Sequence, residues 1–263
     1  MGLVGKAATA AVGLALLAVL CSPASAELTQ SGDLFVSFSG GIDPGALPRH
    51  VRAPIAVRVA GKIRTLSGDQ PPSVRGISIE INRGGRVDTR GLPVCPRAKI
   101  EATSSEGALA ACESALVGEG SFAAQTAFPE QLAFPARGRI LAFNSTTGDG
   151  RRTILAHVYG STPAPISRIV VFHLGHGKGA YGTVLSASLP ESLIHWGYLK
   201  RISLNLYRRF TYRGRVHSYL SAACDAPPGF RTASFRFAHT SMSFADGRTL
   251  SSTLTRSCRV REG

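Results

Sequence analysis

The feature that most constrains this chain is the alternation of apolar and polar side chains with a period of two. The runs 55–59, 77–82 and 202–207 each place an apolar residue at every second position. Successive side chains of a strand point to opposite faces, so each run predicts a strand with one buried face. Further strands are predicted at 34–38, 138–143, 153–159, 167–174, 183–189, 215–220, 232–238, 241–245 and 249–256.

Turn signals separate these runs. The dipeptide Asp246-Gly247 lies between two alternating segments, which is a strong indication of a β-hairpin, and Gly84-Gly85 marks another turn. Within 233–244 the apolar positions change from odd to even numbers, and this predicts a β-bulge or turn near His239.

One short helix is expected among the strands. It opens at Ser105-Glu106, and apolar residues then recur at three-to-four spacing as far as Leu116. Many short strands and one helix predict an all-β fold, a mainly antiparallel β-sandwich of jelly-roll or immunoglobulin-like type. We expect a single domain over 27–263, with two β domains at 27–146 and 147–263 as the alternative.

Residues 1–26 have the layout of a secretory signal peptide. Lys6 is followed by an apolar run at 11–20 and by the small-x-small sequence of Ala24–Ala26. The run is shorter than the roughly 20 residues that cross a bilayer, so we expect export, cleavage after Ala26 and no transmembrane segment in the mature chain. Lipid anchoring at Cys21 is disfavoured because Leu20 stands where lipoprotein processing needs a small residue.

Four cysteines remain after such cleavage, and an even number in an exported chain predicts disulfides. Three pairings are possible, and the two separated clusters favour Cys95–Cys112 and Cys224–Cys258. None of these cysteines has a second one two to four residues away, the spacing typical of zinc sites, so no metal or other cofactor is predicted.

Several stretches contain residue types found in active sites, without the context that those sites require. Gly177, Gly179 and Gly182 follow a strand in a GxGxxG pattern, but a second strand comes next, where a dinucleotide site needs a helix. A glycine-rich hairpin loop is therefore the better interpretation. The sequon Asn144-Ser145-Thr146 is expected to be a loop.

Candidate catalytic and metal-binding groups are equally unspecific. His173 and His176 could bind a metal together with His157 or His195, but no carboxylate lies near them in the sequence. The sequence has no Gly-x-Ser-x-Gly elbow and only four acidic residues after residue 150, which disfavours a hydrolase. We assign no catalytic residue and no cofactor.

Positive charge is concentrated in the second half of the chain. Residues 27–150 hold 13 basic and 12 acidic side chains, whereas residues 151–263 hold 16 and 4. Such asymmetry indicates an anionic partner, an envelope polymer or a phospholipid surface, and export disfavours nucleic acid. Codon usage in a GC-rich genome accounts for the preference of Arg over Lys, though not for the scarcity of acids.

Arginines and aromatic residues alternate between residues 207 and 215. This pattern could hold phosphate groups, so the candidate anion-binding residues are Arg208, Arg209, Arg213 and Arg215. The alternative is an exposed strand face on which arginine stems cover apolar surface.

Several strings together carry a resemblance, including Gly91–Cys95, Ser218–Cys224 and Phe244–Leu250. They resemble a family of secreted proteins of unknown function from GC-rich actinobacteria. The resemblance spans most of the mature chain. It implies export and carries over no catalytic residue.

The leading hypothesis is an exported, non-catalytic binding or structural protein of the cell envelope or extracellular space. Its basic C-terminal half would contact an anionic polymer or lipid. The alternatives are an exported hydrolase with an unassigned site and a lipid carrier with an apolar cavity between the sheets.

Overall fold

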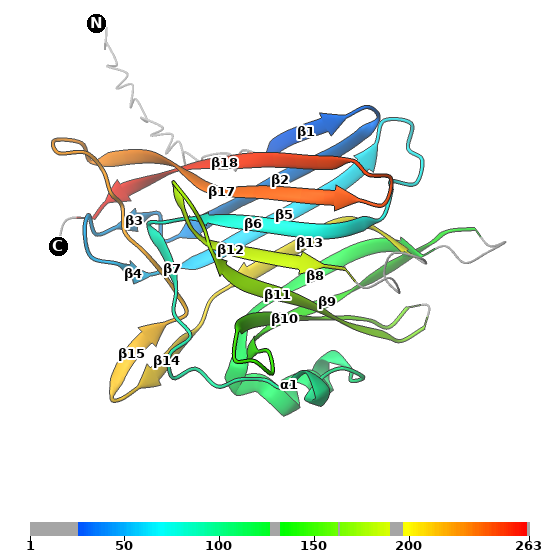
Figure 1. Cartoon of the computed structure of the whole chain (residues 1–263), viewed down its shortest axis with the longest axis horizontal. Coiled ribbons are helices and arrows are strands. Elements are labelled where there is room, and N and C mark those ends of the chain that lie inside the picture. Colours follow the sequence, from blue (N-terminus) through cyan, green and yellow to red (C-terminus); the bar gives the residue numbers. More distant parts are fainter. Residues whose placement is uncertain (1–25, 127–131, 163, 190–196, 262–263) are drawn as a thin grey trace, which may run out of the picture.

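The computed structural model describes residues 26–126, 132–162, 164–189 and 197–261. The predicted signal peptide, including Cys21, lies outside these residues except for Ala26. Strands dominate the described part of the chain (Figure 1), and one short helix is tied to it by a disulfide. The prediction of a mainly antiparallel, all-β fold with one short disulfide-pinned helix is confirmed.

Thirteen strands of the described residues form one continuous sheet. All neighbouring pairs are antiparallel except β18 and β3, which are parallel. The order is β1 (Glu27–Ser31), β2 (Leu34–Asp43), β5 (Ala56–Thr65), β13 (Gly197–Leu206), β8 (Leu116–Thr126), β9 (Phe134–Thr146), β10 (Arg152–Gly160), β11 (Ile166–His176), β12 (Tyr181–Ser188), β6 (Val74–Asn82), β17 (Thr232–Phe244), β18 (Thr249–Val260) and β3 (Ala46–Leu47).

This sheet curls until its two ends meet, with β1 and β2 beside β18 (Figure 1), so the walls around the apolar interior are parts of one sheet. Strands β2 and β18 contribute buried side chains to the same apolar cluster. Polar side chains close the seam between the ends. Arg256 Nη1 donates to Glu27 Oε1 at 2.8 Å, and Arg248 Nη1 donates to Asp33 Oδ1 at 2.7 Å.

Glycines in neighbouring strands permit the curl. A Cβ atom on Gly120 of β8 would lie 2.0 Å from the carbonyl oxygen of Ser203, and one on Gly138 of β9 would lie 2.0 Å from that of Tyr159. A side chain at either position would push the adjacent strand away. Glycines and β-bulges are the usual means by which an antiparallel sheet acquires strong curvature.

The predicted hairpins are present. Strands β17 and β18 meet at Asp246-Gly247, where Gly247 has a φ of 86° that favours glycine. Strand β17 runs through both segments predicted at 232–238 and 241–245, and its bulge lies at 236–238, just before the expected position. The glycine-rich segment after His176 forms the turn between β11 and β12, as predicted.

Two small sheets complete the fold. The strands β4 (Ala53–Pro54), β16 (Leu220–Ala222) and β7 (Gly85–Val87) form one of them, in the order β4-β16-β7. The strands β14 (Arg209–Tyr212) and β15 (Arg215–Ser218) form a hairpin that extends away from the large sheet in Figure 1.

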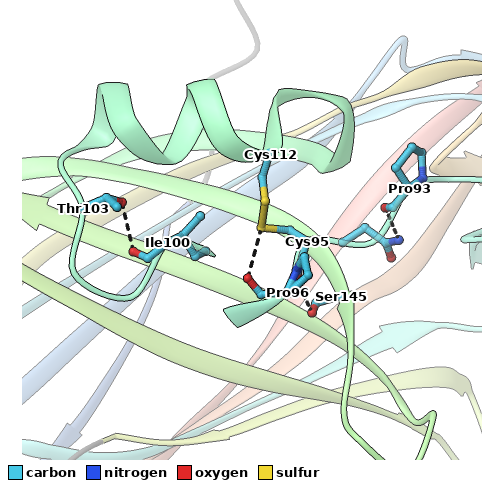
Figure 2. Close-up of a disulfide and its surroundings, with 8 residues drawn as sticks. Pro93, Cys95, Pro96, Ile100, Thr103, Cys112 and Ser145 are labelled. Carbon is cyan, nitrogen blue, oxygen red and sulfur yellow. Dashed lines mark hydrogen bonds between the residues drawn. A yellow bond between two sulfur atoms is a disulfide. The ribbon is translucent and has the colours of Figure 1, made fainter. Parts of the chain in front are cut away.

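Helix α1 (Ser105–Cys112) lies against the outer face of the large sheet, between the short 3-10 helices η1 (Arg97–Lys99) and η2 (Glu113–Ala115). The Ser104 hydroxyl caps it by accepting a hydrogen bond from the Gly107 amide. The disulfide Cys95–Cys112 joins the last residue of the helix to the segment beneath it (Figure 2). Both predicted disulfides are present, since Cys224 is bonded to Cys258.

The prediction of a loop at the sequon was wrong. Asn144 and Ser145 are buried residues at the end of β9. The Asn144 amide donates to the carbonyl of Pro93 at 2.9 Å, and the Ser145 hydroxyl donates to that of Cys95 at 2.7 Å (Figure 2). These bonds place Cys95 where it can reach the helix.

The two disulfides indicate an oxidising, extracytoplasmic setting. No helix among the described residues has the length and apolar character needed to cross a bilayer.

Candidate ligand-binding site

The inner face of the curled sheet borders two apolar cavities. The first has a volume of about 520 Å³ and is bordered by β7 and β16 of the small sheet. The second has a volume of about 340 Å³. Both volumes lie within the range of roughly 300–1,000 Å³ that is typical of ligand pockets in proteins.

The cavities follow one another along the same strands. On β5, Val57 lines the first cavity, Gly61 lines the second, and Val59 between them lines both. Strands β6, β10, β13 and β17 repeat this pattern. The side chains that line both cavities are Val59, Ile79, Ala156, Phe172, Leu204 and Ala238. The two cavities therefore lie end to end in one elongated interior.

The length of this interior suits an extended apolar chain. Strand β6 lines it from Ile81 to Val74, and seven residues at about 3.3 Å each span about 23 Å. The acyl chains of one leaflet span about 15 Å, half of the roughly 30 Å hydrocarbon core of a bilayer.

Several apolar side chains of the interior keep accessible surface although they point inward. Val57, Ile79 and Phe172 are only half-buried, because each faces a cavity. The apolar residues on the opposite face of β9 and β10 behave differently, since Phe143 and Leu141 are completely buried beneath α1.

Basic side chains gather where the first cavity reaches the surface. Its lining includes Arg52, Arg83 and Arg86, all exposed, and Asp225 is the single carboxylate among its described lining residues. Arg52 Nε donates to the carbonyl of Gly84 at 3.4 Å, which draws Arg52 to the turn between β6 and β7. None of the ion pairs found among the described residues involves these three arginines.

A fourth arginine at this rim, Arg49, is hydrogen-bonded to backbone carbonyl groups. The guanidinium of Arg49 donates to the carbonyls of Ala226, Pro227 and Phe230, the latter two at 2.9 and 2.8 Å. Arg49 therefore fixes the loop after Cys224.

Tyr198 is one of the residues that line the second cavity. Its hydroxyl donates to the Gln125 side-chain oxygen, and burial raises the pKa of Tyr198 above its ordinary value. The phenol is therefore a neutral, hydrogen-bonded group in this wall.

The predicted anion-binding arginines fall into two groups. Arg209, Arg213 and Arg215 are exposed on the β14–β15 hairpin, together with Val216, whose exposed fraction is 74%. Arg208 is half-buried at the base of the hairpin, where its Nη2 donates to the Ser114 carbonyl at 3.3 Å. The other face of the hairpin carries Phe210 and Tyr212, which are half-buried.

One histidine lies beside a serine, but in an enclosed place. His157 Nε2 lies 3.1 Å from the Ser167 hydroxyl and 3.1 Å from the carbonyl oxygen of Thr103, beneath the segment that leads into α1. The His157 side chain is completely buried, and burial lowers the pKa of His157. Neither His157 nor Ser167 lines either of the two cavities.

The other histidines predicted as candidate metal ligands are His173, His176 and His195. His173 and His176 are exposed on β11, and His195 lies outside the described residues. Across the described ranges, no group of three or more His, Cys, Asp or Glu side chains is arranged to hold a metal ion.

In comparisons with known proteins, the chain matched no family model, no curated protein and no solved structure. The resemblance to secreted actinobacterial proteins therefore stays a prediction. Sequence reasoning missed Arg52, Arg83 and Arg86, although the Gly84-Gly85 turn signal stands directly between the last two.

Proposed function

We propose that this protein is a non-catalytic binding protein that holds an apolar ligand, of the class of a lipid acyl chain, in the interior of its curled sheet. The observation that carries the proposal is the pair of consecutive cavities, about 520 and 340 Å³, lined mainly by aliphatic and aromatic side chains. Water gains few hydrogen bonds in such a space, so an apolar ligand that displaces it is favoured.

The working place of this binding protein is outside the cytoplasm. The two disulfides support an oxidising compartment. We further propose that residues 1–26 act as a signal peptide cleaved after Ala26, so that the mature chain is secreted or retained at the envelope.

Displacement of a neutral fluorescent probe tests the binding of an apolar ligand. N-phenyl-1-naphthylamine should bind the oxidised, delipidated mature protein with enhanced fluorescence, and a long-chain lipid should displace it. An organic extract of protein purified without delipidation should contain lipid by mass spectrometry. A protein that neither binds the probe nor carries lipid would refute the proposed function.

A matched pair of variants tests whether the probe binds in the interior of the curled sheet. Ala156→Phe fills the point where the two cavities meet and should reduce probe binding at least tenfold. Ala123→Phe adds the same ring on β8 at a half-buried position that lines neither cavity, and should leave binding unchanged. Equal effects of the two substitutions would argue against binding in the interior.

A second candidate function, contact with an anionic envelope polymer or phospholipid surface, is favoured by the β14–β15 hairpin. Three exposed arginines and exposed Val216 lie together on it. Charge reversal at Arg209, Arg213 and Arg215 should abolish salt-sensitive retention on isolated envelopes. Charge reversal at Arg58, Lys62 and Arg201, exposed on the outer face of the sheet, is the control. Retention that is unchanged in the first variant would exclude this role.

A further inference from the structure

The rim of the first cavity differs from its walls in chemistry. The walls are aliphatic and aromatic, whereas the rim carries Arg52, Arg83 and Arg86 with a single acid, Asp225. These arginines come from two segments that meet at the open end. Arg52 precedes β4, Arg83 lies in the turn between β6 and β7, and Arg86 lies in β7 itself. The interior thus changes from apolar to strongly basic over a short distance.

Charge of one sign at the opening of a low-dielectric cavity concentrates the electric field there. The three guanidinium groups have no carboxylate partner within ion-pairing distance among the described residues. A guanidinium can form two parallel hydrogen bonds with a carboxylate or phosphate, and such charge-assisted bonds are the strongest that side chains offer.

We propose that Arg52, Arg83 and Arg86 bind the anionic headgroup of an amphiphile whose apolar chain occupies the interior. The inference rests on the proposed function and names its ligand class: a lipid with an apolar chain and a carboxylate or phosphate head. The chain enters the 520 Å³ cavity first, and the head stays at the basic rim, where solvent can still reach it.

Arg49 has a different part in this arrangement. Its hydrogen bonds to the carbonyls of residues 226–230 hold the loop that follows Cys224, and Cys224 is bonded to Cys258 in the cavity wall. Arg49 therefore shapes the rim and is left unchanged in the test variants.

The test compares ligands that share a chain and differ in the head. cis-Parinaric acid and its methyl ester form the carboxylate pair, and lysophosphatidate and monoacylglycerol with one common chain form the phosphate pair. The wild-type protein should bind the anionic member of at least one pair about tenfold more tightly than the neutral member. This preference should shrink as the salt concentration rises.

The variant carrying Arg52→Gln, Arg83→Gln and Arg86→Gln should lose that preference and keep the wild-type affinity for the methyl ester. The control variant carries Arg58→Gln, Lys62→Gln and Arg201→Gln, which changes the net charge by the same amount on the outer face. It should keep the preference. The pair that shows the larger preference distinguishes a phosphate head from a carboxylate head.

Three outcomes would overturn the inference, and they differ in what they leave standing. Equal affinity of the wild-type protein for the anionic and the neutral member in both pairs refutes headgroup binding and leaves the apolar site intact. Loss of ester binding in the arginine variant, with an unchanged circular dichroism spectrum, shows that the arginines shape the cavity only. No binding of any ligand refutes the proposed function itself.

Discussion

The two faces of β9, β10 and β11 carry similar apolar side chains in different surroundings. On the outer face, Phe143 and Leu155 are buried in one cluster with Cys95 and Cys112. On the inner face, Ala156 and neighbouring apolar side chains border the two cavities. Helix α1 and its disulfide cover the outer face, whereas two cavities remain among the apolar side chains on the inner face.

An apolar face is stabilised by whatever removes it from water. On the outer face the covering element belongs to the chain itself, and the disulfide keeps it in place. On the inner face the strands enclose cavities, so some apolar side-chain surface stays exposed there. A bound ligand could bury that surface. Changes on the outer face should therefore act on folding, and changes on the inner face should act on binding.

The largest contrast is expected between two phenylalanines. Phe143→Ala removes a completely buried ring beneath α1 and should lower the free energy of unfolding by about 3–5 kcal/mol. Phe172→Ala removes a half-buried ring that borders both cavities, and should cost about 1 kcal/mol while weakening binding of the neutral probe. Urea unfolding of both variants measures the difference. Equal losses of stability would mean that the inner face is packed as tightly as the outer one.

The two disulfides extend this comparison. Replacing Cys95 and Cys112 by Ala should lower the free energy of unfolding by about 3 kcal/mol and leave probe binding unchanged. The bond Cys224–Cys258 closes a loop twice as long, 34 residues against 17, which adds about 0.6 kcal/mol. Its removal should also weaken probe binding, because Cys258 lines the first cavity.

Urea unfolding and probe titration of the two double variants separate these effects. If removal of Cys95–Cys112 weakened binding as much as removal of Cys224–Cys258, the outer and inner faces would not be independent.

The outer face should also contribute a pH dependence of stability, through His157. Burial lowers the pKa of His157 below its ordinary 6.5, so the unfolded chain takes up a proton before the folded one does. Well above pH 6.5, His157 is neutral in both states and contributes no pH dependence to the free energy of unfolding. As the pH falls through 6.5 the free energy of unfolding should drop by up to about 1.4 kcal/mol per pH unit, until the folded pKa is reached.

The variant His157→Gln should lose this part of the pH dependence, and His173→Gln, at an exposed position of β11, should keep it. Stability measured by urea unfolding between pH 7.5 and 5 decides the matter. Parallel curves for wild type and His157→Gln would show that folding does not lower the pKa of His157.

The local parts of this structure could be predicted from the sequence because neighbouring residues determine them. The alternation at 77–82 forms β6, and Asp246-Gly247 forms the predicted hairpin. The pairing of the cysteines followed from their separation into two clusters. Each of these features depends on residues that are close in the chain.

The candidate site depends on long-range pairing and could not be predicted in the same way. Strand β13 lies between β5 and β8, and this order is what brings the inner faces together around a cavity. Arg52, Arg83 and Asp225 are far apart in the sequence and meet only at the rim. The prediction of a loop at the sequon was wrong because the Asn144 side chain is hydrogen-bonded to Pro93, which is far away in the sequence. A local sequence pattern cannot indicate such a contact.

The smallest expected effect is also a direct test of free space in the interior. Gly61 lines the second cavity on β5, and the atoms nearest to a Cβ there would belong to Ile202, Met242 and Phe38 at 3.4–3.9 Å, which is ordinary contact. Gly61→Ala should therefore raise the free energy of unfolding by about 0.5 kcal/mol, since alanine restricts the unfolded chain more than glycine does. Gly138→Ala is the opposite case, because its Cβ would collide with the backbone of β10, and it should destabilise the protein. Urea unfolding resolves the two signs. A loss of stability in Gly61→Ala would show that the inner face has no room for one methyl group. The inner face would then be packed as tightly as the outer face, which contradicts the proposed ligand site.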